Sequence, residues 1–71
     1  MIKSGADVRR ADLSGETPLH HCAGRGFLLA CRLLIEMGAD PRAKTKKGFS
    51  PRQFAKMRGR VDVFKLLTDA L

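Results

Sequence analysis

The chain has 71 residues, of which 44% are hydrophobic and 30% are charged. A chain of this length makes at most one small domain, because it buries only about 60% of the surface that its unfolded form exposes. No apolar run approaches the ~20 residues of a membrane-spanning helix, and the first ten residues lack the apolar segment of a secretory signal. Two cysteines are too few for a disulfide framework, so we expect a cytoplasmic or nuclear protein.

The net charge of +7 lies entirely in the second half of the chain. Residues 1–40 hold five Lys/Arg and five Asp/Glu, whereas residues 41–71 hold nine Lys/Arg and two Asp. A local excess of one sign steers association with partners of the opposite sign. The sequence therefore indicates an acidic partner or surface near the second half, with a merely solvated charged face as the alternative.

A period of about 33 residues runs through the sequence, within the range of known repeat architectures. Three motifs return at this offset: "GAD" at 5–7 and 38–40, "GETPLHHCAGRG" from 15 and "GFSPRQFAKMRG" from 48, and "LLACRLLIEMG" at 28–38 and "VDVFKLLTDAL" at 61–71. Three alignments at one offset identify a structural repeat.

Each repeat contains the start signals of a first helix. Thr17 and Ser50 are favourable N-cap residues, and each precedes a proline, which the first helical turn tolerates. Ser50 and Gln53 also form the pattern of a capping box, and His20 occupies the place of Gln53 in the first repeat. We predict a helix from the proline after Thr17 to the glycine turn at 24–26, and its counterpart after Ser50.

A second helix follows in each repeat. In the first repeat, apolar residues with helical spacing predict an inner face made of Leu28, Cys31, Leu34 and Ile35, widened by Ala30 and Leu33. In the second repeat, the same pattern predicts an inner face made of Val61, Val63, Phe64, Leu66 and Leu67. Gly38 is placed to end the first of these helices. The charged, glycine-containing segment 41–49 suits an extended turn between repeats.

These motifs closely resemble the ankyrin repeat family. The family's first-helix motif is matched by Gly15, Thr17, Pro18, Leu19, His20, Ala23 and Gly26, and its "LL-x-x-GAD" motif by Leu33, Leu34, Gly38, Ala39 and Asp40. The resemblance implies an all-α solenoid of antiparallel helix pairs with projecting β-turn fingers, in which neighbouring repeats bury one another's faces. It covers the whole chain as the end of one repeat (1–7), one full repeat (8–40) and a C-terminal capping repeat (41–71).

Departures from the family pattern indicate where the stack ends. Arg9 and Arg42 stand where the family usually has Asn, and the second repeat carries polar side chains at Arg52, Gln53 and Lys56. A polar outer face is what a terminal repeat needs. The opposite flank of the first helix pair is expected to be apolar and open, so we predict further ankyrin repeats N-terminal to this chain.

The adjacent residues His20, His21 and Cys22 raise the question of a metal site or an active site. Consecutive side chains on a helix point about 100° apart, so these three cannot converge on one ion. Cys31 could approach Cys22, but two thiols do not complete a zinc site. The family pattern has a small packed alanine at Cys22, which implies a buried, inert thiol. We therefore predict no catalytic residue, cofactor or metal, and the resemblance implies a non-catalytic scaffold for protein binding.

The resemblance also implies a partner-binding surface on the finger tips and the exposed side of the first helices. The residues that we predict to form it are Leu13, Arg25, Lys44, Lys46, Lys47, Phe49, Met57 and Arg58. Most are cationic and the others are apolar. Because charge orients a ligand and apolar anchors supply much of its affinity, we predict binding of an acidic segment of another protein.

Alternatives to this prediction stay open. Phe49 could simply cover the base of its finger, and the lysines could be solubilising. The same cations could bind nucleic acid or an anionic membrane, although aromatic residues for base stacking are scarce. The repeats could also serve only to cap a longer array.

Overall fold

The computed structural model describes residues 8–70, and the expectations for residues 1–7 and Leu71 lie outside the described part. Its helices are α2 (Pro18–Arg25), α3 (Leu28–Glu36), α4 (Pro51–Met57) and α5 (Val61–Ala70). No strand occurs within residues 8–70. None of the helices described is long and apolar enough to cross a membrane. The predicted all-α fold class is confirmed.

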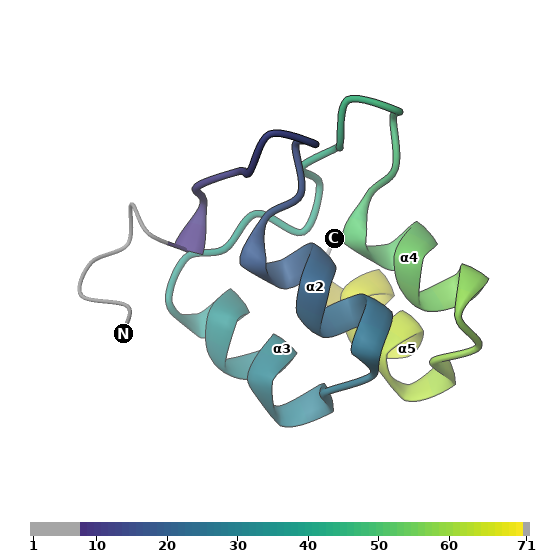
Figure 1. Ribbon diagram of the computed structural model, residues 1–71. Coiled ribbons are helices and arrows are strands. Elements are labelled where there is room, and N and C mark those ends of the chain that lie inside the picture. The colour runs from purple at the N-terminus through teal and green to yellow at the C-terminus, as the bar shows by residue number, and fades with distance from the viewer. Residues whose placement is uncertain (1–7, 71) are drawn as a thin grey trace.

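The helices form two pairs that lie side by side. Helix α2 packs against α3 within the first pair and α4 against α5 within the second, while α2 contacts α4 and α3 contacts α5 between the pairs. The loops that precede α2 and α4 project together from one side of the molecule as two fingers (Figure 1). We call them finger 1 (residues 11–16) and finger 2 (residues 44–49).

Both predicted capping boxes are present. The Thr17 backbone N–H donates to His20 Nδ1 at 3.1 Å, and the His20 N–H donates to Thr17 Oγ1 at 3.4 Å. In the second pair the Ser50 N–H donates to Gln53 Oε1 at 2.8 Å, and the Gln53 N–H donates to Ser50 Oγ at 3.3 Å. These bonds satisfy backbone donors that a helix start leaves without an intrahelical partner, which is why both helices begin at the proline after the cap.

The hydrophobic core lies along the seam between the two pairs. Its buried apolar members are Val8, Leu19, Ala23, Cys31, Leu34, Ala39, Ala55, Val63 and Leu67. The side chains of Leu34 and Leu67 occupy equivalent positions of the two repeats, on α3 and α5. Positions that are 33 residues apart in the sequence can thus take equivalent places in the core.

Two residues predicted to face inward do not do so. Leu33 is 56% exposed and Val61 is 63% exposed. Val63 and Leu67, four residues apart, define the buried face of α5, and Val61 is turned about 200° away from Val63. Leu33 is likewise turned about 100° from buried Leu34. The predicted apolar stripes were therefore too wide.

The two fingers are built by the same hydrogen bonds. Asp12 Oδ1 accepts the backbone N–H groups of Ser14 and Glu16, both at 2.9 Å. Thr45, at the equivalent position of finger 2, accepts the N–H groups of Lys47 and Phe49 on Oγ1, both at 3.2 Å. The carboxylate and the hydroxyl therefore perform one task, holding a tight turn.

The fingers also touch each other through their backbones. The Lys46 N–H donates to the Ser14 carbonyl oxygen at 3.1 Å. Next to this bond, Gly15 has a φ of +82°, and a Cβ placed on it would lie 2.8 Å from the Lys46 nitrogen. Glycine is needed here for its left-handed backbone and for the close approach of finger 2.

Candidate partner-binding surface

A groove of about 480 Å³ lies between the two fingers and α4. Its lining residues are Leu13, Ser14, Glu16, Thr45, Lys46, Lys47, Phe49, Phe54 and Met57. Five of the eight residues predicted for partner binding are among them: Leu13, Lys46, Lys47, Phe49 and Met57. The structure thus brings together side chains from two repeats in one groove. We call it the finger groove.

The aromatic side of the finger groove is a set of rings in tilted and edge-to-face contact. Phe49 and Phe54 have ring centroids 6.2 Å apart, and Phe54 meets the imidazole of His20 edge-on at 5.2 Å. Phe49 is half-buried, and its backbone holds finger 2 by accepting the Thr45 N–H at 2.9 Å. Phe49 therefore both closes the base of its finger and offers part of its ring to the groove.

The rim of the finger groove combines exposed apolar and cationic side chains. Leu13 is 91% exposed and Met57 is 57% exposed. Lys46 and Lys47 are exposed on the tip of finger 2. Single exposed apolar residues are ordinary, but here two of them border the same concave surface beside two lysines.

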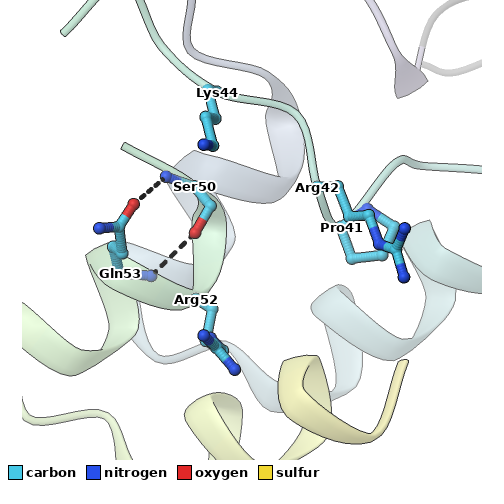
Figure 2. A pocket seen from close by; sticks show the side chains of 6 residues that line it. All are labelled: Pro41, Arg42, Lys44, Ser50, Arg52 and Gln53. Atoms are coloured by element: carbon cyan, nitrogen blue, oxygen red, sulfur yellow. Dashed lines mark hydrogen bonds between the residues drawn. The ribbon is translucent and has the colours of Figure 1, made fainter. Parts of the chain in front are cut away.

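Three predicted residues lie elsewhere. Lys44 lines a separate pocket with Pro41, Arg42, Ser50, Arg52 and Gln53 (Figure 2). Arg25 is the last residue of α2 and Arg58 follows the last residue of α4. Both arginines are exposed, and neither lines the finger groove.

The sequence prediction missed Phe54. This residue precedes Met57 by three positions and Arg58 by four, a spacing that places side chains on one helix face. The helical period could therefore have found it.

His20 connects the first helix pair to finger 2. Its Nδ1 accepts the Thr17 N–H, so Nε2 carries the proton and donates to the Phe49 carbonyl oxygen at 2.9 Å. The side chain is fully buried, and this burial lowers the pKa of His20 although the bond to the Phe49 carbonyl opposes the shift. The predicted local role is confirmed, and the bond to Phe49 adds a link between the two repeats.

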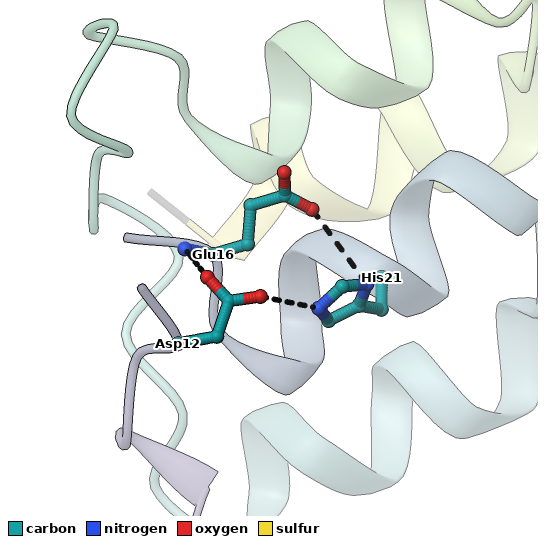
Figure 3. A group of neighbouring side chains, drawn as sticks. All are labelled: Asp12, Glu16 and His21. Atoms are coloured by element: carbon teal, nitrogen blue, oxygen red, sulfur yellow. Dashed lines mark hydrogen bonds and ion pairs between the residues drawn. The ribbon is translucent and has the colours of Figure 1, made fainter. Parts of the chain in front are cut away.

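His21 points to a different place from His20. Its Nε2 lies 3.3 Å from Asp12 Oδ2 and its Nδ1 lies 3.6 Å from Glu16 Oε1 (Figure 3). Backbone N–H donors, that of Glu16 foremost, hold the pKa of Asp12 below its ordinary value. The two carboxylates approach different ring nitrogens of this exposed imidazole.

The same three side chains form a group with metal-ligand atoms that the sequence analysis did not find. One ligand atom from each of Asp12, Glu16 and His21 lies within 4.8 Å of the others. The ring nitrogens of His21 point in different directions, and each faces a different carboxylate. The group is exposed or half-buried, and exposed acidic groups are common in proteins without a bound ion.

The two thiols are placed as packed side chains. Cys31 is fully buried and Cys22 is half-buried against the core. Burial raises the pKa of Cys22, and it raises the pKa of Cys31 to about 12. A nucleophilic cysteine needs a lowered pKa, because the thiolate is the reactive form. The prediction of a buried, inert thiol concerned Cys22, which the structure places as half-buried against the core rather than fully buried.

Paired helices stacked side by side, with fingers tied at one edge, define a helical repeat protein. A family model described as ankyrin repeats in three copies matches residues 1–70. The chain therefore belongs to the ankyrin repeat family, as its motifs predicted. Repeats of this family are a general protein–protein interaction module and are generally not enzymatic.

Relatives of the chain occur in otherwise different proteins. The potassium channel GORK of Arabidopsis thaliana is 35% identical over 69 residues, which is 97% of this chain and 8% of the channel. The ankyrin repeat protein nuc-2 of Neurospora crassa is 39% identical over 67 residues, 93% of this chain and 6% of that protein. A putative ankyrin repeat protein of Neisseria meningitidis is 38% identical over 60 residues, 84% of this chain and 24% of that protein. The chain spans less than a quarter of the length of each relative.

Proposed function

We propose that the chain binds an acidic segment of another protein in the finger groove, as a non-catalytic scaffold. The observation that carries the proposal is the convergence of Lys46, Lys47, Leu13 and Met57 from two repeats on one concave surface. The lysines attract and orient an acidic ligand, and the apolar side chains supply contacts that become buried on binding. Both cysteines are free thiols, which supports a reducing compartment, the cytoplasm or the nucleus.

One acidic side chain, Glu16, lines the finger groove and lowers its positive charge. Among the ion pairs described for residues 8–70, Glu16 Oε1 lies 3.6 Å from His21 Nδ1 and is not paired with a lysine. The two lysines still leave a net positive lining. We therefore expect Glu16→Gln to strengthen binding of an acidic ligand and Lys46→Glu to weaken it.

The proposal is tested with peptides selected on the chain from a random library. We expect selected peptides to combine several Asp or Glu with one large apolar residue. Lys46→Glu with Lys47→Glu should slow their association and flatten its salt dependence, because steering by exposed charge is screened by salt. The matched control is Lys56→Glu with Lys65→Glu, which makes the same charge change at exposed positions outside the groove.

Binding that survives the double reversal of Lys46 and Lys47 at low salt would contradict the proposal. Leu13→Ala with Met57→Ala separates the two contributions. This change should speed dissociation and leave the salt dependence intact, because it removes apolar contact and no charge. Selection of nucleic acid, or retention on anionic vesicles in preference to acidic peptides, would favour the electrostatic alternative instead.

A second function, completion of a longer stack, is favoured by a different surface. Leu29 is 77% exposed on α3, and Leu33, four residues later on the same face, is 56% exposed. We propose that repeats N-terminal to 8–40 cover these leucines, with residues 1–7 as the end of the preceding repeat and 41–71 as the cap. In a longer chain, Leu29→Lys with Leu33→Lys should lower the melting temperature, whereas the 71-residue chain should lose little stability.

A further inference from the structure

The pocket around Lys44 is lined by different residues from those of the finger groove and has a different chemistry. Its volume is about 400 Å³, and its lining residues are Pro41, Arg42, Lys44, Ser50, Arg52 and Gln53. Three of the six are cationic and none is acidic. The cations come from three segments: the loop between the repeats, the first limb of finger 2 and the first turn of α4 (Figure 2).

The capping box decides which polar atoms the pocket can offer. The Ser50 hydroxyl oxygen accepts the Gln53 N–H, and the Gln53 amide oxygen accepts the Ser50 N–H. Each side-chain oxygen therefore already accepts one bond, and the hydrogens on the hydroxyl and on the amide nitrogen remain as donors. Lys44, Arg42 and Arg52 carry only donors as well. All the charged side chains that line the pocket are therefore cationic hydrogen-bond donors.

Arg52 is held at its place in this pocket. Its guanidinium carbon lies 5.6 Å from the centroid of the Phe64 ring on α5, in a cation–π arrangement, and the residue is half-buried. A guanidinium is a planar fork of N–H donors that fits the oxygens of a tetrahedral oxyanion. Lys44, in contrast, is exposed and can adjust to the ligand.

We propose that this pocket binds the phosphate group of a phosphorylated protein segment. A phosphorylated side chain carries about −1.5 to −2 charges and three acceptor oxygens. A pocket lined by several cations and hydrogen-bond donors suits a phosphate group better than a carboxylate, because a carboxylate brings only one charge and two oxygens. Only one residue, the buried Thr45, separates Lys44 of this pocket from Lys46 of the finger groove in the sequence, and we propose that one protein segment contacts both sites.

The protein source of the phosphate rests on the proposed function, whereas the phosphate chemistry of the pocket does not. The test is an NMR titration of the isotope-labelled chain, in a buffer without phosphate, with inorganic phosphate and with acetate. We expect phosphate to shift the backbone amide signals of Ser50 and Gln53 and acetate to leave them nearly unchanged. Lys44→Gln should weaken phosphate binding about tenfold, since a charge-assisted hydrogen bond is lost.

Matched variants identify the residues responsible. Arg52→Lys keeps the charge and removes the fork, and it should also weaken phosphate binding. The control Arg32→Gln with Lys65→Gln removes one arginine and one lysine at exposed positions that do not line the pocket, and it should bind phosphate as the native chain does. Equal losses in Lys44→Gln and in this control, or shifts spread over all lysine-rich segments, would overturn the proposal.

The source is tested with one acidic peptide selected on the finger groove, synthesised with a flanking serine, phosphoserine or glutamate. The phosphoserine form should bind about tenfold more tightly than the other two, and Lys44→Gln should remove that gain. Lys46→Glu with Lys47→Glu should weaken all three peptides and leave binding of inorganic phosphate in place. Phosphate binding without any gain for the phosphoserine peptide would contradict a protein segment as the source.

Discussion

The two helix pairs share one backbone plan but bury different side chains. Helix α2 buries Leu19 and His20, whereas the equivalent positions of α4 in the second repeat are a half-buried Arg52 and an exposed Gln53. Each first helix contacts two other helices, α2 with α3 and α4, and α4 with α2 and α5, but Arg52 and Gln53 of α4 line the Lys44 pocket. The comparison teaches that capping and turns repeat with the sequence period, whereas side-chain polarity follows the place of a helix in the stack.

The largest expected difference between the pairs is in core truncation. Leu19→Ala should lower the free energy of unfolding by about 3 kcal/mol, because it leaves a cavity at a fully buried site. Arg52→Ala should cost about 0.5–1 kcal/mol, the worth of a partly exposed cation–π contact with Phe64. Urea unfolding followed by far-UV circular dichroism measures both values. Equal losses would show that the two first helices bury equal surfaces.

A smaller difference is expected between the two finger-tip glycines. Gly15 and Gly48 have φ values of +82° and +86°, so alanine at either site costs about 1–2 kcal/mol of backbone strain. At Gly15 the new Cβ also meets the Lys46 nitrogen at 2.8 Å, whereas nothing lies within 4 Å at Gly48. Gly15→Ala should therefore destabilise the chain more in the same urea experiment. Identical midpoints would mean that the fingers do not depend on their mutual contact.

The smallest expected effect is on the pH dependence of stability. Burial lowers the pKa of His20, so below about pH 6.5 the unfolded chain binds a proton that the folded chain does not. The stability contributed by the neutral ring is complete above that pH and declines as the pH falls below it, toward the lowered pKa. Gln53, the counterpart in the second pair, does not titrate.

His20→Gln copies that counterpart into the first pair. This variant should be less stable at neutral pH, because the bond to Phe49 is lost, and its stability should fall less between about pH 7.5 and about pH 5. Equal slopes for the two proteins would exclude His20 as a source of the pH dependence.

The sequence allowed the helix starts to be predicted closely, because Thr17, Ser50 and the prolines after them act through local hydrogen bonds. It was less informative about inner faces, since an apolar residue such as Val61 fits the helical period whether or not a neighbour covers it. In the partner surface, finger and helix positions predicted Leu13, Lys46 and Met57 together. The separation of Lys44 from them depends on which way each side chain leaves finger 2, and that direction is fixed only by the folded turn around Thr45.

The bond from the Lys46 N–H to the Ser14 carbonyl oxygen joins the fingers through backbone atoms, which any residue other than proline at position 46 also supplies. A ligand that lies across both tips therefore meets a platform whose shape is already set, and little ordering entropy is lost on docking. Substitutions at the tips that keep Gly15 and the Lys46 N–H can therefore change the chemistry of the surface without changing the backbone contact that shapes it.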